Sequence, residues 1–250
     1  GVAKTLIMRT IAVVMGCKFS RIQFTPDLLP TDIVGLTSYE KGRGFYVLKG
    51  PVFSNFVLAD EINRAPPKVQ SALLESMQEK QATIGKETFP LPLPFFVLAT
   101  QNPIENVGTY PLPEAQVDRF LFKLFISYPS IQDEIKILTT NMTTTKFEDF
   151  ALTPVLSTDS IIEMQDAVKR VYVDERISEY IVKIVDATRN PSRYKVESGK
   201  YVQWGSSPRA SIGVYVASKA HAMLNGRNFV TPQNVKFVAP HVLNHRISIN

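Results

Sequence analysis

Two adjacent carboxylates, Asp60 and Glu61, end a short apolar run that begins at Phe56. An apolar run of this length fits a buried strand of a parallel sheet, and such sheets bind ligands beyond the carboxyl ends of their strands. One carboxylate can hold a hard cation such as Mg²⁺, directly or through water, while its neighbour polarises a water molecule. The pair therefore suits phosphate chemistry, although an ordinary strand followed by an acidic first turn of a helix gives the same hexapeptide.

The chain opens with residues that match the end of a phosphate-binding loop, namely Gly1, Val2, Ala3, Lys4 and Thr5. In the complete pattern, G-x-x-x-x-G-K-[ST], backbone N–H groups cradle the phosphates, the lysine reaches the β and γ phosphates, and the hydroxyl binds Mg²⁺. Lys4 and Thr5 fit this pattern, whereas Ala3 stands where the pattern has its last glycine. We expect the preceding strand and the first part of the loop to lie before residue 1.

Two further residues could contact a nucleotide. Asn102 follows a second buried strand, 94–99, and could hold the attacking water or a γ-phosphate oxygen, although an Asn-Pro pair also starts turns. Arg119 directly precedes the apolar residues 120–122, which we expect to form a last strand. Arg119 is either a surface salt-bridge residue or an arginine presented to the nucleotide of a neighbouring subunit, because guanidinium matches phosphate oxygens geometrically.

A third arginine, Arg209, stands in the first turn of a predicted helix. Ser207 is the expected N-cap of this helix, and Pro208 occupies its first position. The free N–H groups of a first helical turn favour an anion. The helix would hold Arg209 rigidly among these groups.

The predicted secondary structure that positions these residues changes near residue 127. Before it, strands alternate with helical segments, and after it the pattern is helical only. The first part contains expected strands at 20–24, 56–60 and 94–99, a helix at 66–77 and an exposed hairpin around Gly85. The second part contains expected helices at 131–138, 158–171 and 175–189, one that starts at Ser207 and one that starts at Thr231.

Composition describes an ordinary globular protein. Of its 250 residues, 44% are hydrophobic and 20% are charged. The sequence has no apolar run of about 18 residues, so we expect no membrane span. A single cysteine, Cys17, excludes an intrachain disulfide, and with no visible signal peptide it predicts a cytoplasmic protein. The net charge of +5 comes from scattered residues, which makes nucleic acid an unlikely partner.

Taken together, these motifs resemble an AAA+ ATPase of the MoxR family. The resemblance extends over nearly the whole chain and rests on four stretches: QFTPDLLPTD at 23–32, LADEINRA at 58–65, ATQNP at 99–103 and PEAQVDRF at 113–120. It implies an α/β fold, in which a P-loop AAA+ αβα domain with a parallel sheet occupies 1–127. An all-helical lid domain would follow at 128–250.

The resemblance also implies how ATP and Mg²⁺ are bound. The phosphate-binding residues would be Gly1, Val2, Ala3, Lys4 and Thr5, and the family often has alanine before the lysine. Lys4 would bind the β and γ phosphates, and Thr5 would hold Mg²⁺ with Asp60 as a more distant partner of the same ion. Glu61 would activate the attacking water.

Three further roles follow from the same resemblance. Asn102 matches the sensor-1 position, Arg209 matches sensor 2, and Arg119 matches the arginine finger that one subunit supplies to the next. The last role requires a homo-oligomeric ring, which we expect to be hexameric. The hairpin around Gly85 matches the helix-2 insert of this clade, a segment that faces a pore or a partner.

The function that the resemblance implies is Mg-dependent ATP hydrolysis that drives chaperone-like remodelling, maturation or activation of a partner complex. In this family the partner often bears a von Willebrand A domain. One alternative is a nucleic-acid-dependent motor, which the net charge allows, although no winged helix or aromatic-basic strip is visible. Another alternative is a nucleotide-gated binding scaffold with little hydrolysis, which the presence of both Glu61 and Arg119 disfavours.

Overall fold

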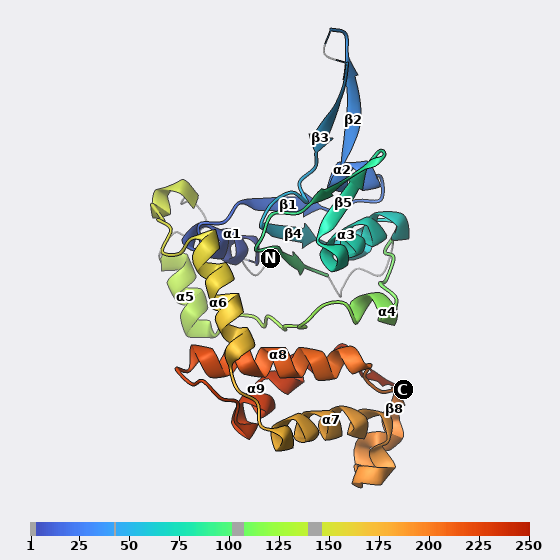
Figure 1. Ribbon diagram of the computed structural model, residues 1–250, viewed down its shortest axis with the longest axis vertical. Helices are drawn as coiled ribbons and strands as arrows, with labels where there is room; N and C mark the ends of the chain where they lie inside the picture. The colour runs from blue at the N-terminus through green and yellow to red at the C-terminus, as the bar shows by residue number, and fades with distance from the viewer. Residues whose placement is uncertain (1–3, 43, 102–107, 140–146) are drawn as a thin grey trace. The chain divides into compact units, whose positions relative to one another are not determined.

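The computed structural model describes residues 4–42, 44–101, 108–139 and 147–250 (Figure 1). The chain packs into two units. Unit 1 comprises Gly1–Leu112 and Ile126–Ile162, and unit 2 comprises Pro113–Phe125 and Glu163–Asn250. Two segments cross the predicted boundary at residue 127, since 113–125 packs in unit 2 and 126–162 in unit 1. The division into domains 1–127 and 128–250 therefore stays a prediction.

Unit 1 is built on a parallel sheet of three strands in the order β1–β4–β7. The strands are β1 (Phe19–Gln23), β4 (Phe56–Asp60) and β7 (Phe96–Ala99), close to the ranges predicted from the sequence. Gln23 pairs with Asp60, and Ala59 pairs with Ala99, so the carboxyl ends of all three strands meet at one edge. The central strand β4 is buried over residues 56–59, and Asp60 is its first partly exposed residue.

In the described part of unit 1, the first helix contacts the strands of this sheet, and the next two helices contact each other. The helix α1 (Lys4–Val14) buries Met8 and Ala12 in a cluster with Cys17 and Phe56. The helix α3 (Pro67–Glu79) starts with the predicted proline and buries Val69, Leu73 and Leu74 at helical spacing. The short helix α2 (Pro30–Val34) contacts α3. Between β4 and α3, the 3₁₀ turn η1 (Ile62–Arg64) directly follows the acidic pair.

The described part of unit 1 contains two hairpins, and their order corrects one expectation. The hairpin β2 (Gly35–Glu40)–β3 (Gly44–Lys49) follows the second helix, α2, and projects from the unit in Figure 1. The hairpin β5 (Gln81–Ile84)–β6 (Glu87–Pro90), around Gly85, follows the third helix, α3. The assignment of the Gly85 hairpin to the helix-2 insert is therefore wrong.

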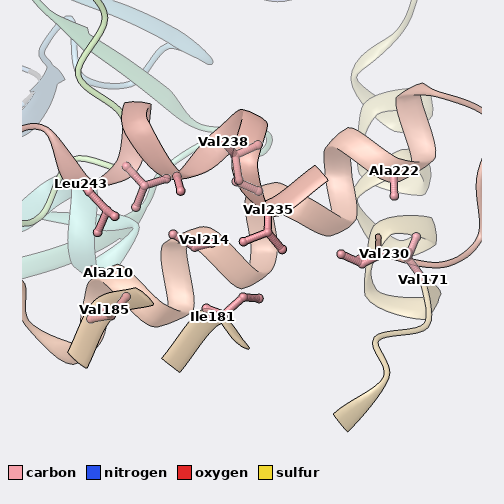
Figure 2. Close-up of a cluster of buried hydrophobic side chains, with 13 residues drawn as sticks. Val171, Ile181, Val185, Ala210, Val214, Ala222, Val230, Val235, Val238 and Leu243 are labelled. Carbon is pink, nitrogen blue, oxygen red and sulfur yellow. The ribbon is translucent and has the colours of Figure 1, made fainter. Parts of the chain in front are cut away.

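Unit 2 is mainly helical. Its long helices are α7 (Glu175–Arg189), α8 (Pro208–Leu224) and α9 (Pro232–Leu243), and β8 (Val202–Trp204) pairs with β9 (Ser248–Ile249). Figure 2 shows the core that these helices share, in which Val185, Val214 and Val235 are fully buried. The short elements α4 (Glu114–Val117), η3 (Pro191–Tyr194) and η4 (Glu197–Tyr201) also lie in unit 2. The elements α5 (Ile131–Thr139) and η2 (Phe147–Phe150) lie in unit 1, and α6 (Thr158–Arg170) begins in unit 1 and ends in unit 2. No helix in the described part of the chain is both long and apolar enough to cross a membrane.

The sequence predicted the helices of the second part of the chain well. Asp174 caps α7 by accepting a hydrogen bond from the Arg176 N–H at 2.9 Å, and Ser207 caps α8 in the same way. The last strand expected at 120–122 is wrong, because these residues are irregular in the structure. The backbone groups near these residues form hydrogen bonds with α9 and the chain after it. The Lys123 N–H donates to the His241 carbonyl, and Arg246 donates to the Phe120 carbonyl.

Candidate active site

Asp60, at the end of β4, accepts hydrogen bonds at both of its carboxylate oxygens. Its Oδ1 accepts from the Thr100 hydroxyl at 2.6 Å. Its Oδ2 accepts from Arg21 Nη2 at 2.7 Å and from Arg21 Nε at 3.1 Å. Burial alone would raise the pKa of the Asp60 carboxyl, but the hydrogen bonds from Thr100 and Arg21 and the charges of Arg21 and Lys4 lower it. Asp60 is therefore ionised at neutral pH.

Glu61 has an unusual backbone conformation and a restrained side chain. Its φ of 57° and ψ of 48° lie in the left-handed region, which non-glycine residues seldom adopt. Its N–H donates to the Thr100 hydroxyl at 2.9 Å. Its Oε2 accepts from Gln23 Nε2 at 2.9 Å and lies 3.1 Å from Arg64 Nε. Local contacts from three chain segments thus fix both the backbone and the carboxylate of Glu61, as expected where strain is held at a functional site.

Thr100 connects the two acidic residues. Its single hydroxyl donates to Asp60 and accepts from the Glu61 N–H, and its carbonyl accepts from the Ile62 N–H at 3.0 Å. Thr100 is buried and directly follows β7, whose pairing with β4 places it beside Asp60. The sequence analysis assigned no role to Thr100, Arg21 or Gln23. The signal that could have found them is the parallel register, which aligns the ends of the three strands.

The remaining residues predicted for this part of the site are only partly described. Lys4 and Thr5 open α1, and Lys4 is close enough to Asp60 for its charge to lower the pKa of that carboxyl. Gly1, Val2 and Ala3 lie outside the described residues, and so does Asn102. The structure therefore brings Lys4, Asp60 and Glu61 into one region of unit 1, and the role of Asn102 stays a prediction.

Arg209 is held by an acidic residue within unit 2. Ser207 donates its hydroxyl hydrogen to Asp118 Oδ2 at 2.8 Å and accepts from the Arg209 N–H at 3.1 Å. The Nη1 of Arg209 lies 3.6 Å from Asp118 Oδ2. The buried Arg246 donates from Nε to the other Asp118 oxygen at 2.8 Å. Asp118 therefore holds the N-cap residue of α8 through Ser207 and pairs with the guanidinium of Arg209, the predicted sensor arginine. The sequence analysis did not identify Asp118.

Arg119 differs from its neighbour Asp118 in being exposed. Its backbone N–H donates to the Gln116 carbonyl at 3.2 Å. Within the described ranges, no ion pair or hydrogen bond engages its guanidinium group. An exposed, uncommitted guanidinium next to a rigidly bonded aspartate is suited to contact an anion outside its own unit.

The oxygen atoms of unit 1 fit a divalent cation. The hydroxyl of Thr5 and the carboxylate of Asp60 are hard oxygen donors, and the low pKa of Asp60 keeps its charge available. The Oδ1 of Asp60 accepts one hydrogen bond, from Thr100, and retains capacity for a further contact, whereas Oδ2 already accepts two hydrogen bonds from Arg21. When bound there, Mg²⁺ would neutralise phosphate charge and polarise the phosphate oxygens.

Two family models match the chain. Residues 1–122 match the ATPase family associated with various cellular activities (AAA), and residues 197–249 match the AAA lid domain. The predicted fold class, an α/β AAA+ domain with a parallel sheet and a helical lid domain, is confirmed by these matches and by the sheet β1–β4–β7.

Several known proteins are similar over the full chain. Chaperone MoxR1 of Mycobacterium tuberculosis is 50% identical over 99% of the chain, which spans 65% of that relative. YeaC of Bacillus subtilis, an uncharacterised protein, is 47% identical over the whole chain and 75% of its own length. The protein MoxR of Paracoccus denitrificans is 28% identical over the whole chain and 78% of its own length. A crystal structure of a candidate ATPase from Cytophaga hutchinsonii has a TM-score of 0.91 and 47% identity, covering the whole chain and 76% of that structure.

The hydroxyl of Thr100 generates a prediction about stability. Replacing Thr100 by valine keeps the shape of the side chain but leaves an Asp60 oxygen and the Glu61 N–H without their partner. We expect the free energy of unfolding at neutral pH to fall by about 1–3 kcal/mol, measured by urea unfolding. Thr83→Val is the matched control, since the Thr83 hydroxyl bonds only the exposed hydroxyl of Thr88, and it should change stability by less than about 0.5 kcal/mol.

The same two proteins should differ in their response to acid. Because the pKa of Asp60 is lowered on folding, its ionised form contributes stability above the unfolded pKa of about 3.9, and this contribution is lost as pH falls through the folded pKa. Thr100→Val removes one of the contacts that lower this pKa. The difference in unfolding free energy between wild type and Thr100→Val should therefore shrink below about pH 4. A difference that grows in acid would contradict this role of Thr100.

Proposed function

The chain belongs to the MoxR family of AAA+ ATPases, and on that premise we propose that it hydrolyses ATP with Mg²⁺ to remodel, mature or activate a partner protein complex. The main support is the arrangement at the end of β4, where an ionised Asp60 and a separately held Glu61 lie together. The charge of Lys4 reaches the same place from the start of α1. Because the chain spans 65% of the M. tuberculosis relative, the activity of the whole protein is part of the proposal.

In the proposed reaction, Lys4 binds the β and γ phosphates, and Thr5 and Asp60 hold Mg²⁺. The Glu61 carboxylate accepts a proton from water, whose oxygen attacks the γ phosphorus while the bond to the bridging oxygen breaks and ADP leaves. Gln23 and Arg64 each contact Glu61 Oε2, and so they orient the carboxylate for this proton transfer. Asn102, at the sensor-1 position, is proposed to hold the water or a γ-phosphate oxygen.

We further propose a homo-oligomeric ring, of hexameric form, in which Arg119 contacts the nucleotide of the next subunit. The exposure of Arg119 and its uncommitted guanidinium in the described part of the chain support this role. Arg209 would contact the γ phosphate from the lid domain, and its ion pair with Asp118 would be exchanged for that contact. An arginine supplied by a neighbour is worth about 10³- to 10⁵-fold in rate.

We propose that the hairpin β2–β3 contacts the partner complex and that this complex contains a von Willebrand A domain. Its cross-strand pair Tyr39 and Phe45 packs ring to ring at 5.1 Å, yet these residues are 63% and 79% exposed. Exposed aromatic pairs of this kind favour protein contacts. Titration of such a domain should show weaker binding to Phe45→Ser than to wild type, and equal affinities would contradict this role of the hairpin.

Turnover of ATP tests the proposed hydrolysis. Wild type should release phosphate in the presence of Mg²⁺, and the rate per subunit should rise with protein concentration as rings assemble. Glu61→Gln should still bind ATP but lose at least about 100-fold in turnover, because the amide cannot accept the proton. The matched control is Glu75→Gln, which changes an exposed glutamate of α3 and should retain the wild-type rate. Equal turnover by Glu61→Gln and wild type would overturn the proposed role of Glu61.

Mixing two inactive variants tests the ring. Arg119→Ala should bind ATP with wild-type affinity and lose most of its turnover, while Arg227→Ala, another exposed arginine of unit 2, should not. In a mixed ring, an Arg119→Ala subunit keeps its Glu61 and can receive Arg119 from a neighbouring Glu61→Gln subunit. Such an interface has both residues intact. We expect such mixtures to recover part of the turnover. If Arg119→Ala turns over normally, or if mixing never restores activity, the arrangement in trans is wrong.

A further inference from the structure

Gln70 has a fully buried side-chain amide, which forms hydrogen bonds with carbonyls outside its own helix. It lies in the first turn of α3, is 0% exposed, and packs beneath the turn that follows Glu61. Its Nε2 lies within hydrogen-bond distance of three carbonyls, those of Ile62 at 3.2 Å, Ala65 at 3.1 Å and Tyr110 at 2.9 Å, and shares its two hydrogens among them. Its Oε1 is buried and has no hydrogen-bond partner in the described part of the chain. Ile62 and Ala65 are buried, and a buried carbonyl without a donor is costly, so the carbonyls of these two residues depend on the Gln70 amide.

The contacts of Gln70 complete the support of the Glu61 turn. On one side, Thr100 accepts from the N–H groups of Glu61 and Ile62. On another, the Tyr110 N–H donates to the Asn63 carbonyl at 2.6 Å, and Gln70 binds the carbonyl of the same tyrosine. Gln70 therefore joins the turn to the chain segment at Tyr110, while Thr100 joins it to the end of β7.

These contacts of Thr100 and Gln70 with the turn determine the position of the Glu61 carboxylate. Glu61 is in the left-handed region, a conformation that persists only where neighbouring contacts impose it. With Gln70 absent, two carbonyls of the turn would lack their donor, and the turn could rotate about Glu61 to pair them elsewhere. We propose that Gln70 is a positioning residue for hydrolysis, acting through Glu61 by locking the turn 61–65. This inference rests on the proposed ATPase function.

Gln70→Met tests the proposal because methionine has a similar length and volume but no donor. In the full chain, we expect kcat to fall roughly 30- to 100-fold, as for a misplaced catalytic group, with KM and the Kd of a fluorescent ATP analogue changed less than about twofold. In a Glu61→Gln background the same substitution should have little further effect, because a residue that acts through Glu61 then has nothing to position. A merely destabilising change would lower turnover in both backgrounds.

Two controls separate positioning from folding. Ser76→Ala changes another buried polar residue of α3, whose hydroxyl bonds only the Ala72 carbonyl of the same helix, and kcat should stay near wild type. Gln70→Asn keeps an amide donor that is too short to reach all three carbonyls, so it should fold and lose an intermediate part of kcat. Hydrogen exchange of the amides in 61–65, measured without nucleotide, should speed up in Gln70→Met and stay unchanged in Ser76→Ala.

The outcomes distinguish this inference from the proposed function. If wild type hydrolyses ATP and Gln70→Met does so within about twofold, Gln70 positions nothing and the inference is overturned. If Gln70→Met fails to fold, full turnover by Gln70→Asn overturns it equally. If wild type itself has no turnover, the proposed function fails, and the exchange measurement alone decides: unchanged exchange of 61–65 in Gln70→Met shows that the amide does not hold the turn.

Discussion

The in-register pairing of β1, β4 and β7 is the constraint on which the candidate site depends. Because Gln23 pairs with Asp60, and Ala59 pairs with Ala99, the residues that end the three strands converge at one edge. Because β4 is buried over residues 56–59, a charged side chain can be accommodated only at its end, where Asp60 lies. A shift of one residue in the β4–β7 pairing would separate Thr100 from Asp60, and a shift in the β1–β4 pairing would move Arg21 and Gln23 away from the two carboxylates.

An acidic pair at this edge is tolerated because each carboxylate has its own partners. Asp60 is bonded by Thr100 and Arg21, while Glu61 is bonded by Gln23 and paired with Arg64. Thr100 then accepts from the N–H groups of Glu61 and Ile62, and Gln70 donates to the carbonyls of Ile62 and Ala65 in the same turn. The two carboxylates thus remain distinct in environment although they are adjacent in sequence. Such separation is what a site needs when one residue serves a cation and the other a water molecule.

Much of this arrangement could be predicted from local sequence, and the remainder could not. Asp60, Glu61 and the Ser207 cap were found because each follows directly from its own segment, a buried strand or a helix start. Thr100 and Gln70 act through contacts with residues about 40 and 8 positions away, which no local pattern encodes. The prediction of a strand at 120–122 was wrong because backbone groups there form hydrogen bonds with α9 and Arg246 instead of with another strand. Asn102 lies outside the described residues, so its role stays a prediction.

The most direct test of the central claim is the affinity of Mn²⁺, as a spectroscopic substitute for Mg²⁺, measured by electron paramagnetic resonance with a non-hydrolysable ATP analogue bound. We expect a nucleotide-dependent Mn²⁺ site in wild type whose affinity falls at least about tenfold in Asp60→Asn, because the cation loses a negatively charged partner. Asp166→Asn, a change to an exposed aspartate of α6, should leave it intact. Equal Mn²⁺ affinity in wild type and Asp60→Asn would contradict the claim that the end of β4 is the metal-nucleotide site.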